Sequence, residues 1–126
     1  MQVLVDTSIW IDYFRGDGDS DKLDLLIDEN LVVTNEVILA ELLPYLKIKK
    51  QRKVIELLHE INKTPLDINW EEIVDFQTKC LKSGANGVGI PDLMIAQNAR
   101  QNGSEIYSLD KHFRVLSQVL GIDLYK

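Results

Sequence analysis

The chain has 126 residues, of which 45% are hydrophobic and 27% charged, as in ordinary soluble globular domains and unlike disordered or collagen-like chains. Its 14 Lys and Arg residues against 20 Asp and Glu residues give a formal net charge of −6, which argues against a basic DNA-coating protein or a polybasic membrane anchor. The net charge of the whole chain does not determine the charge at any one site, so a local nucleic-acid-binding site is compatible with a net charge of −6. We expect one domain over residues 1–126, large enough to form its own core.

Short apolar runs alternate with helical patterns along the chain. Residues 3–5 predict a buried strand, followed by a helix that Thr7 or Ser8 can cap and that extends to residue 13 or 14. The same order of strand, capping residues and helix recurs after residues 31–33. Further strands are expected at 66–68, 105–109 and 122–125, and further helices at 21–29, 36–43, 47–62, 69–82, 91–102 and 110–117. Strands that alternate with helices predict a three-layer α/β/α sandwich with a central, mostly parallel sheet.

Glycine and proline mark the breaks between these elements. Gly16 and Gly18 indicate a polar turn at 15–20, and Pro44 indicates the end of a helix or a kink. Three glycines make 83–90 a loop that we expect to be mobile.

The single cysteine, Cys80, excludes an internal disulfide framework and a cysteine-based zinc cluster. We interpret it as a half-buried helix residue in a reducing compartment. The N-terminal apolar run has no basic leader and is interrupted by Asp6, which argues against a signal peptide. No stretch approaches the 18 apolar residues of a membrane-spanning helix. These features predict a cytoplasmic protein with no membrane partner.

Four acids occupy positions where a merely solubilising charge is not expected. Asp6 and Asp110 follow predicted strands at their carboxyl ends, where open α/β sheets bind ligands. Glu41 lies in an apolar helix segment, and Asp92 starts another helix whose following turns are apolar, so we expect each acid to be embedded in an apolar surface. Taken singly, Asp6 and Asp110 could be helix caps and Asp92 could complement a helix dipole. The set of four is what indicates a site.

Charge repulsion decides what these acids can do if they converge. Carboxylates that share one site cannot all ionise near neutral pH unless a cation joins them. Because no set of Cys or His residues accompanies them, the ligands are hard oxygens, which favour Mg²⁺ or Mn²⁺ over Zn²⁺. Such a metal generates hydroxide and stabilises phosphate oxygens, so the pattern predicts hydrolysis of phosphodiester bonds.

The residues around the four acids also match a family pattern in order and spacing, over nearly the whole chain. The matching motifs are VDTSIWID at 5–12, AEL at 40–42, PDLMIA at 91–96 and SLDKHF at 108–113. Together they resemble the PIN domain and, more narrowly, the VapC-type toxins of prokaryotic toxin–antitoxin pairs. The resemblance implies an endoribonuclease that uses Mg²⁺ or Mn²⁺, cleaves an RNA substrate, is neutralised by a cognate VapB-like antitoxin, and forms a homodimer.

The resemblance also assigns roles to individual residues of this chain. It makes Asp6 and Asp92 metal-binding acids, with Glu41 and Asp110 as the helix glutamate and the last acid of the set; Thr7 or Ser8 supplies a hydroxyl beside the first acid. The last motif departs from the family pattern, because His112 stands where a second Asp often precedes the Phe. We interpret His112 as an exposed helix residue, with a role as substrate contact or general acid as the alternative.

A basic segment covers residues 47–53, where five cations occur without an intervening acid. The simplest interpretation is a solvated helix face. The alternative is an edge that steers RNA phosphates toward the acidic cleft and makes RNA binding sensitive to salt. The residues concerned are Lys47, Lys49, Lys50, Arg52 and Lys53.

Three other classes of protein share parts of this pattern with a nuclease. An aspartyl-phosphate phosphatase is disfavoured because Asp6 is followed by Thr7 and Ser8 where that chemistry expects a second Asp two residues on. A receiver domain would need paired acids after its first strand and a late lysine, and neither is evident. The remaining alternative is a catalytically silent PIN-like scaffold that binds RNA or protein. Such a scaffold would be expected to lose acids of the quartet, which this chain retains.

Overall fold

The computed structural model describes residues 1–16 and 20–126, so part of the predicted turn at 15–20, including Gly18, lies outside the described residues. Strands and helices alternate as the sequence predicts. The elements in chain order are β1 (Val3–Val5), α1 (Thr7–Arg15), α2 (Ser20–Asp28), β2 (Val32–Thr34), α3 (Glu36–Ile48), α4 (Arg52–Glu60), β3 (Asn62–Lys63), α5 (Trp70–Lys82), α6 (Ile90–Asn102), β4 (Glu105–Tyr107) and α7 (Lys111–Leu120).

The four strands form one parallel sheet in the order β3-β2-β1-β4. β1 is central, and all three of its side chains are fully buried, which explains its continuous apolar sequence. Val5 of β1 pairs with Tyr107 of β4, and Leu4 pairs with Val33 of β2. Because the strands are parallel, all of their carboxyl ends lie at one edge of the sheet.

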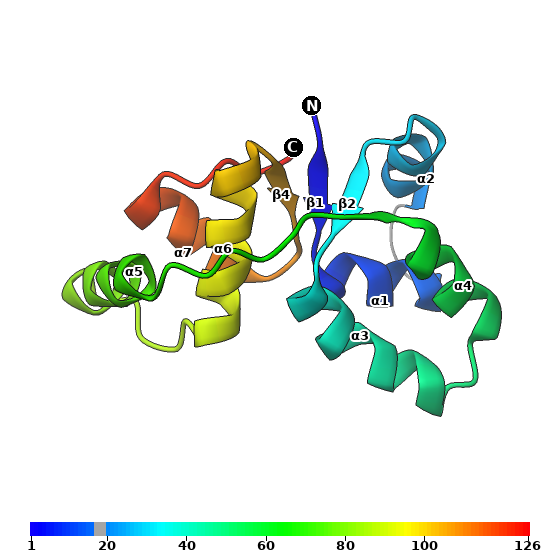
Figure 1. The fold of residues 1–126 in the computed structure, drawn as a ribbon, viewed down its shortest axis with the longest axis horizontal. Helices are drawn as coiled ribbons and strands as arrows, with labels where there is room; N and C mark the ends of the chain where they lie inside the picture. Colours follow the sequence, from blue (N-terminus) through cyan, green and yellow to red (C-terminus); the bar gives the residue numbers. More distant parts are fainter. Residues whose placement is uncertain (17–19) are drawn as a thin grey trace.

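Helices cover both faces of this sheet. α5, α6 and α7 pack against one another on one side of the strands, whereas α1, α3 and α4 pack together on the other (Figure 1). The largest buried side chains come from both layers: Trp10 belongs to α1, Phe76 to α5 and Phe113 to α7. This arrangement confirms the predicted α/β/α sandwich with a parallel sheet.

Side-chain caps and glycines set the helix ends. Asp6, and not Thr7 or Ser8, is the N-cap of α1, and Asn35 caps α3 by accepting a hydrogen bond from the Ile38 N–H at 2.9 Å. Gly16 ends α1 with φ of 71°, a left-handed conformation that favours glycine.

Two predicted helix boundaries are wrong. α3 continues through Pro44 to Ile48, because buried side chains such as Leu42 and Leu46 hold the helix against the core on both sides of the proline. The predicted helix 47–62 is correspondingly divided, and α4 starts only at Arg52. The division falls at Lys50, whose φ of 57° is left-handed and breaks the helix.

The weaker strand predictions are also corrected. The strand expected at 66–68 is absent; the chain instead pairs with β2 at Asn62–Lys63, two exposed polar residues without an apolar pattern. At 122–125 the predicted strand is reduced to one bridge between Ile106 and Leu124. Residues 83–89 form neither helix nor strand, consistent with a loop, and Cys80 is fully buried where half-burial was expected. Within the described residues, no helix is long and apolar enough to cross a membrane.

Candidate metal centre

The topology of the sheet places Asp6 and Asp110 at adjacent strand ends. Asp6 directly follows β1, and Asp110 comes three residues after Tyr107 at the end of β4. The two strands pair directly, and the Asp6 N–H donates to the Tyr107 carbonyl oxygen at 2.9 Å, so the pairing continues past the end of β1. Each acid also caps the helix that follows its strand, which means that the capping interpretation and the site interpretation apply together.

Two serine hydroxyls fix the orientation of the Asp6 carboxylate. Ser8 Oγ and Ser108 Oγ both donate to Asp6 Oδ2, at 2.9 and 2.8 Å, and the two hydroxyl oxygens lie 3.2 Å apart. Ser8 Oγ in turn accepts from the Leu109 N–H at 3.0 Å, and Ser108 Oγ accepts from the Asp110 N–H at 2.9 Å. Asp6 is only 6% exposed, and within the described residues no hydrogen bond reaches its other oxygen, Oδ1. That oxygen is therefore available for a ligand.

The sequence did not decide whether Thr7 or Ser8 supplies the hydroxyl beside Asp6. The structure assigns this contact to Ser8 and adds a second hydroxyl, that of Ser108, which the sequence did not predict. Ser8 contacts Asp6, whereas the buried Thr7 hydroxyl has no hydrogen-bond partner within the described part of the chain, although it is near enough to Glu41 to lower the pKa of that carboxyl. Ser108 lies in the last motif, SLDKHF at 108–113, but the sequence alone indicates no role for it. Its position two residues before Asp110 is the signal that could have identified it, since the turn after β4 must face the turn after β1.

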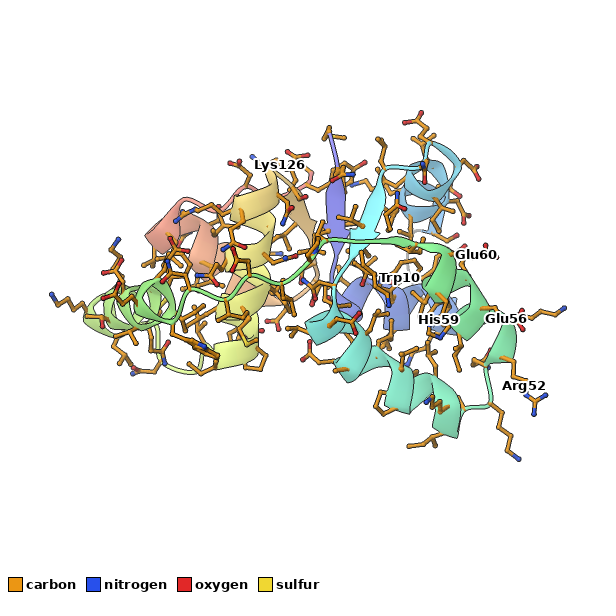
Figure 2. All side chains as sticks on the ribbon, viewed as in Figure 1. Trp10, Arg52, Glu56, His59, Glu60 and Lys126 are labelled. Carbon is orange, nitrogen blue, oxygen red and sulfur yellow. The ribbon has the colours of Figure 1, made fainter. Side chains whose placement is uncertain are left out.

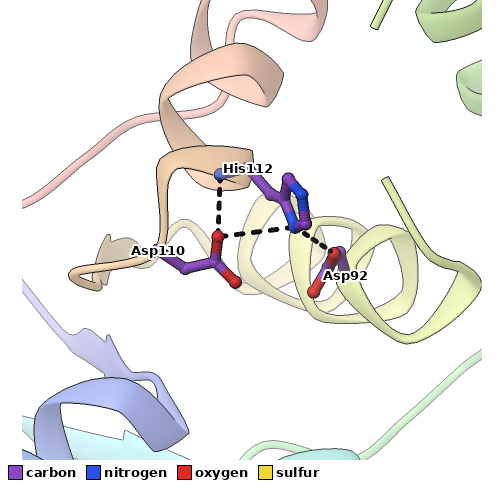
Figure 3. Close-up of side chains that lie close together, drawn as sticks. All are labelled: Asp92, Asp110 and His112. Atoms are coloured by element: carbon purple, nitrogen blue, oxygen red, sulfur yellow. Dashed lines mark hydrogen bonds and ion pairs between the residues drawn. The ribbon is translucent and has the colours of Figure 1, made fainter. Parts of the chain in front are cut away.

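Asp92, Asp110 and His112 form a compact cluster (Figure 3). His112 Nδ1 lies 3.2 Å from Asp92 Oδ2 and 3.4 Å from Asp110 Oδ1, and each residue offers one ligand atom within 4.8 Å of the others. Asp92 Oδ2 also accepts from the Gly89 N–H at 3.3 Å, in the first turn of α6. The His112 side chain is 31% exposed, so its interpretation as an exposed helix residue is wrong: its ring points toward the two acids.

Glu41, on α3, interacts electrostatically with the acids of the same cluster. Partial desolvation and the charges of Asp6, Asp92 and Asp110, in that order, raise the pKa of the Glu41 carboxyl, and the Thr7 hydroxyl partly opposes the shift. The four acids therefore interact electrostatically although they come from four separate parts of the chain, but within the described residues the compact cluster itself contains Asp92 and Asp110 and not Asp6 or Glu41. The expectation that Glu41 is embedded in an apolar surface is wrong, because its α3 position is exposed while the core-facing side of the helix is buried.

The charge of the site is not balanced by basic side chains. Burial raises the pKa of Asp92, as do the charges of Asp110 and Asp6, whereas the Gly89 N–H and His112 lower it. Among residues 1–16 and 20–126, no Lys or Arg forms an ion pair with any of the four acids. A donor set of carboxylate oxygens and one imidazole nitrogen with excess negative charge fits a divalent cation.

A buried amide network connects the two helices that carry Glu41 and Asp92. Asn35 Nδ2 donates to Asn98 Oδ1 at 3.0 Å, Thr64 Oγ1 donates to the same oxygen at 2.6 Å, and Asn98 Nδ2 donates to the Pro65 carbonyl oxygen at 3.0 Å. Asn35 is 0% and Asn98 2% exposed. The network fixes the start of α3 against the middle of α6. Sequence reasoning treated Asn35 only as a cap and did not single out Asn98.

The basic segment lies apart from this cluster. Its cations are exposed and are distributed over the end of α3, the following turn and the start of α4. Lys47 comes six residues after Glu41, about 9 Å further along the helix axis. Figure 2 shows Arg52 extending outward at the start of α4, whereas Trp10 is enclosed by the molecule. Exposure agrees with a solvated surface, and a role in RNA steering stays a prediction.

Comparison with known proteins identifies the family. A model described as the PIN domain matches residues 3–118. The chain therefore belongs to the PIN domain family. A search of curated proteins found no significant match.

Solved structures share the fold over the whole chain. VapBC2 from Rickettsia felis, bound to a DNA fragment from its promoter, is similar with a TM-score of 0.79 and 20% identity, covering 99% of this chain and 98% of that chain. DNA-bound VapBC from Salmonella typhimurium gives a TM-score of 0.77 at 15% identity, covering 99% and 97%. VapBC-1 from nontypeable Haemophilus influenzae gives 0.72 at 20% identity, covering 100% and 98%. These similarities establish the fold.

Proposed function

We propose that this protein is an endoribonuclease that uses Mg²⁺ or Mn²⁺ and acts in the cytoplasm as the toxin of a toxin–antitoxin pair, with a single nuclease domain over residues 1–126. The proposal is carried by the mutual electrostatic interaction of four carboxylates that have no Lys or Arg partner among the described residues. Membership of the PIN domain family supports it. The four carboxylates are Asp6, Glu41, Asp92 and Asp110.

Each acid has a distinct environment, and its role follows from that environment. Asp6 and Asp92 are the more enclosed, so they hold the cation, with Asp110 beside them and Glu41 on the exposed side. When bound, a divalent cation lowers the pKa of water and neutralises charge on the phosphate. Ser8 and Ser108 keep Asp6 Oδ1 directed to the site by binding Oδ2. Glu41 is placed to orient the attacking water and accept its proton, because it reaches the cleft from the solvent side.

We infer two partners besides the RNA substrate. The structures that share the fold contain VapBC, which supports a VapB-like antitoxin for this chain, and a homodimer is the assembly that the family resemblance implies. An arginine-bearing antitoxin segment would form charge-assisted hydrogen bonds with the same carboxylates and compete with the cation. Purified antitoxin should then suppress cleavage, and unchanged cleavage with antitoxin in stoichiometric excess would contradict this mode of inhibition.

The basic segment extends the proposed RNA-binding surface. Lys47, Lys49, Lys50, Arg52 and Lys53 are exposed beyond the end of α3 that lies away from α6 and α7 (Figure 1). Cations in this place would contact phosphates of an RNA strand that crosses the cleft. We expect RNA affinity to fall as salt increases, with a slope of about 0.7 for each phosphate contacted.

Loss of the Asp6 charge tests the proposed activity. Asp6→Asn retains an oxygen that can accept from Ser8 and Ser108 but removes the charge that holds a cation. We expect cleavage of RNA in Mn²⁺ or Mg²⁺ to fall by about 100-fold or more, since even the outer partners of metal ligands are typically worth 10–100-fold. The measurement is the cleavage rate of a long single-stranded RNA, with circular dichroism to show that the variant is folded.

Asp75→Asn is the matched control, because Asp75 is exposed on α5 and forms an ion pair with Lys79 one turn away, at 3.1 Å. It should cleave RNA at the unmodified rate. Cleavage that persists in a chelator and in Asp6→Asn would contradict the proposal. A folded protein that neither binds Mn²⁺ nor cleaves RNA would favour the silent scaffold.

A further inference from the structure

His112 is held with one ring nitrogen inside the acidic cluster. Nδ1 faces Asp92 Oδ2 and Asp110 Oδ1, at 3.2 and 3.4 Å, and the side chain is 31% exposed (Figure 3). The opposite nitrogen, Nε2, faces the loop before α6, where a Cβ added to Gly87 would lie 3.9 Å away. The ring is thus bounded on both sides, and its Nδ1 side is directed at the two carboxylates.

We propose that His112 Nδ1 is a direct ligand of the cation, which makes this centre a mixed oxygen–nitrogen site that prefers Mn²⁺ and other first-row transition ions to Mg²⁺. The inference rests on the proposed function and specifies the metal for the same site. His112 binds through the Nδ1 lone pair, with its proton on Nε2 at the Gly87 side of the ring. The sequence reasoning from acids alone gave an all-oxygen site, with no preference between the two ions.

The spacing of the three donor atoms is suitable for shared ligation. Two ligands about 2.1 Å from an ion and at right angles to each other are about 3.0 Å apart. The Nδ1 separations of 3.2 and 3.4 Å from the carboxylate oxygens are close to that value. Mg²⁺ takes oxygen ligands, whereas imidazole nitrogen is a ligand of first-row transition ions, whose affinity rises along the row from Mn²⁺, so a nitrogen in this position shifts the preference of the site away from Mg²⁺.

The ring is not needed to start α7. The Asp110 cap is closed by the backbone N–H of residue 112, which donates to Asp110 Oδ1 at 2.9 Å. A side-chain substitution at 112 keeps this hydrogen bond and leaves the helix start intact. Variants at this position therefore separate the chemistry of the ring from the folding of the helix.

Pulsed electron paramagnetic resonance of bound Mn²⁺ tests the ligand directly, using protein labelled with ¹⁵N-histidine. The chain has only two histidines, and the second, His59, is exposed on α4. We expect a histidine nitrogen coupling in the unmodified protein and in the control His59→Gln, and none in His112→Asp. In titrations with each ion, His112→Asp should lower the ratio of Mn²⁺ to Mg²⁺ affinity by roughly tenfold or more, since loss of outer-shell partners alone typically costs 10–100-fold.

The possible failures are distinguishable. Bound Mn²⁺ that shows no histidine coupling in the unmodified protein would overturn the His112 assignment and leave the metal-dependent nuclease standing. A coupling and an affinity ratio that persist in His112→Asp would also overturn it. Absence of specific Mn²⁺ binding in the unmodified protein and in His59→Gln would overturn the proposed function together with this inference.

Discussion

The ionised forms of the Glu41 and Asp92 carboxyls are disfavoured in the metal-free protein. Both carboxyls have raised pKa values, chiefly because desolvation, which is only partial for the exposed Glu41, disfavours the charged form, and neighbouring acids add to the effect. The folded chain therefore binds these protons more tightly than the unfolded chain. Their contribution to the stability of the metal-free protein is lost as pH rises above their ordinary values of 4.5 and 3.8.

Asp92→Asn should consequently stabilise the metal-free protein at neutral pH while weakening metal binding. The amide keeps an oxygen for the Gly89 N–H but removes the repulsion from Asp110 and Asp6. We expect a higher melting temperature than that of the unmodified protein at pH 7 in chelator, and a smaller difference at pH 4. A variant that is less stable than the unmodified protein at pH 7 would show that the Asp92 charge is satisfied without a cation.

The residues of the site differ in how well the sequence predicts them. The four acids stand out because a charge after a buried strand or within an apolar helix is unusual. Ser108 and Asn98 do not stand out, because a hydroxyl or an amide is common anywhere on a surface. Their roles arise only when distant segments meet: Ser108 reaches an acid 102 positions away, and Asn98 reaches Asn35 63 positions away.

Among the elements, those with strong apolar patterns were predicted and those without were not. β1 and β2 can be predicted from the sequence because their residues are continuously apolar and buried. β3, by contrast, consists of the exposed pair Asn62–Lys63, which pairs with β2 because the preceding helix ends beside it. The boundary between α3 and α4 depends on one residue with a left-handed backbone conformation, Lys50. Pro44, which predicts the end of α3, lies within the helix instead. Local sequence patterns therefore predict whether a segment is a helix or a strand better than they predict the residues at which it begins and ends.

The relative position of α3 and α6 depends on the buried network around Asn98. Asn98→Ala would leave the Asn35 amide, the Thr64 hydroxyl and the Pro65 carbonyl without this partner. The Thr64 hydroxyl keeps the Thr34 carbonyl oxygen as an acceptor and Pro65 is exposed, so the Asn35 amide is the buried group left without its acceptor, which costs about 1–3 kcal/mol in the free energy of unfolding.

Chemical denaturation measures this loss, with Gln101→Ala as the control. Gln101 is an exposed amide on the same helix that donates to the Asp67 carbonyl oxygen at 2.8 Å. Its substitution should cost no more than about 1 kcal/mol. Equal losses in the two variants would contradict a special role for the buried network.

At the scale of the whole molecule, the net charge of −6 has a local cause. Without Asp6, Glu41, Asp92 and Asp110, the chain would hold 16 acidic and 14 basic residues, a net charge of −2. Four of the six excess negative charges thus belong to acids that interact electrostatically with one another, and the cations of segment 47–53 are exposed elsewhere on the surface. Overall acidity is compatible with the proposed RNA cleavage, because a cation bound at the site would mask the charge that repels phosphate.

The central claim is that the four carboxylates form one cation site. Calorimetric titration of Mn²⁺ into the purified protein tests it most directly, with Asp92→Asn and the control Asp75→Asn titrated in parallel. The account predicts saturable binding to the unmodified protein and to Asp75→Asn, and binding weakened by about 100-fold or more in Asp92→Asn. Saturable binding of equal affinity in all three proteins, or no binding in any of them, would contradict it.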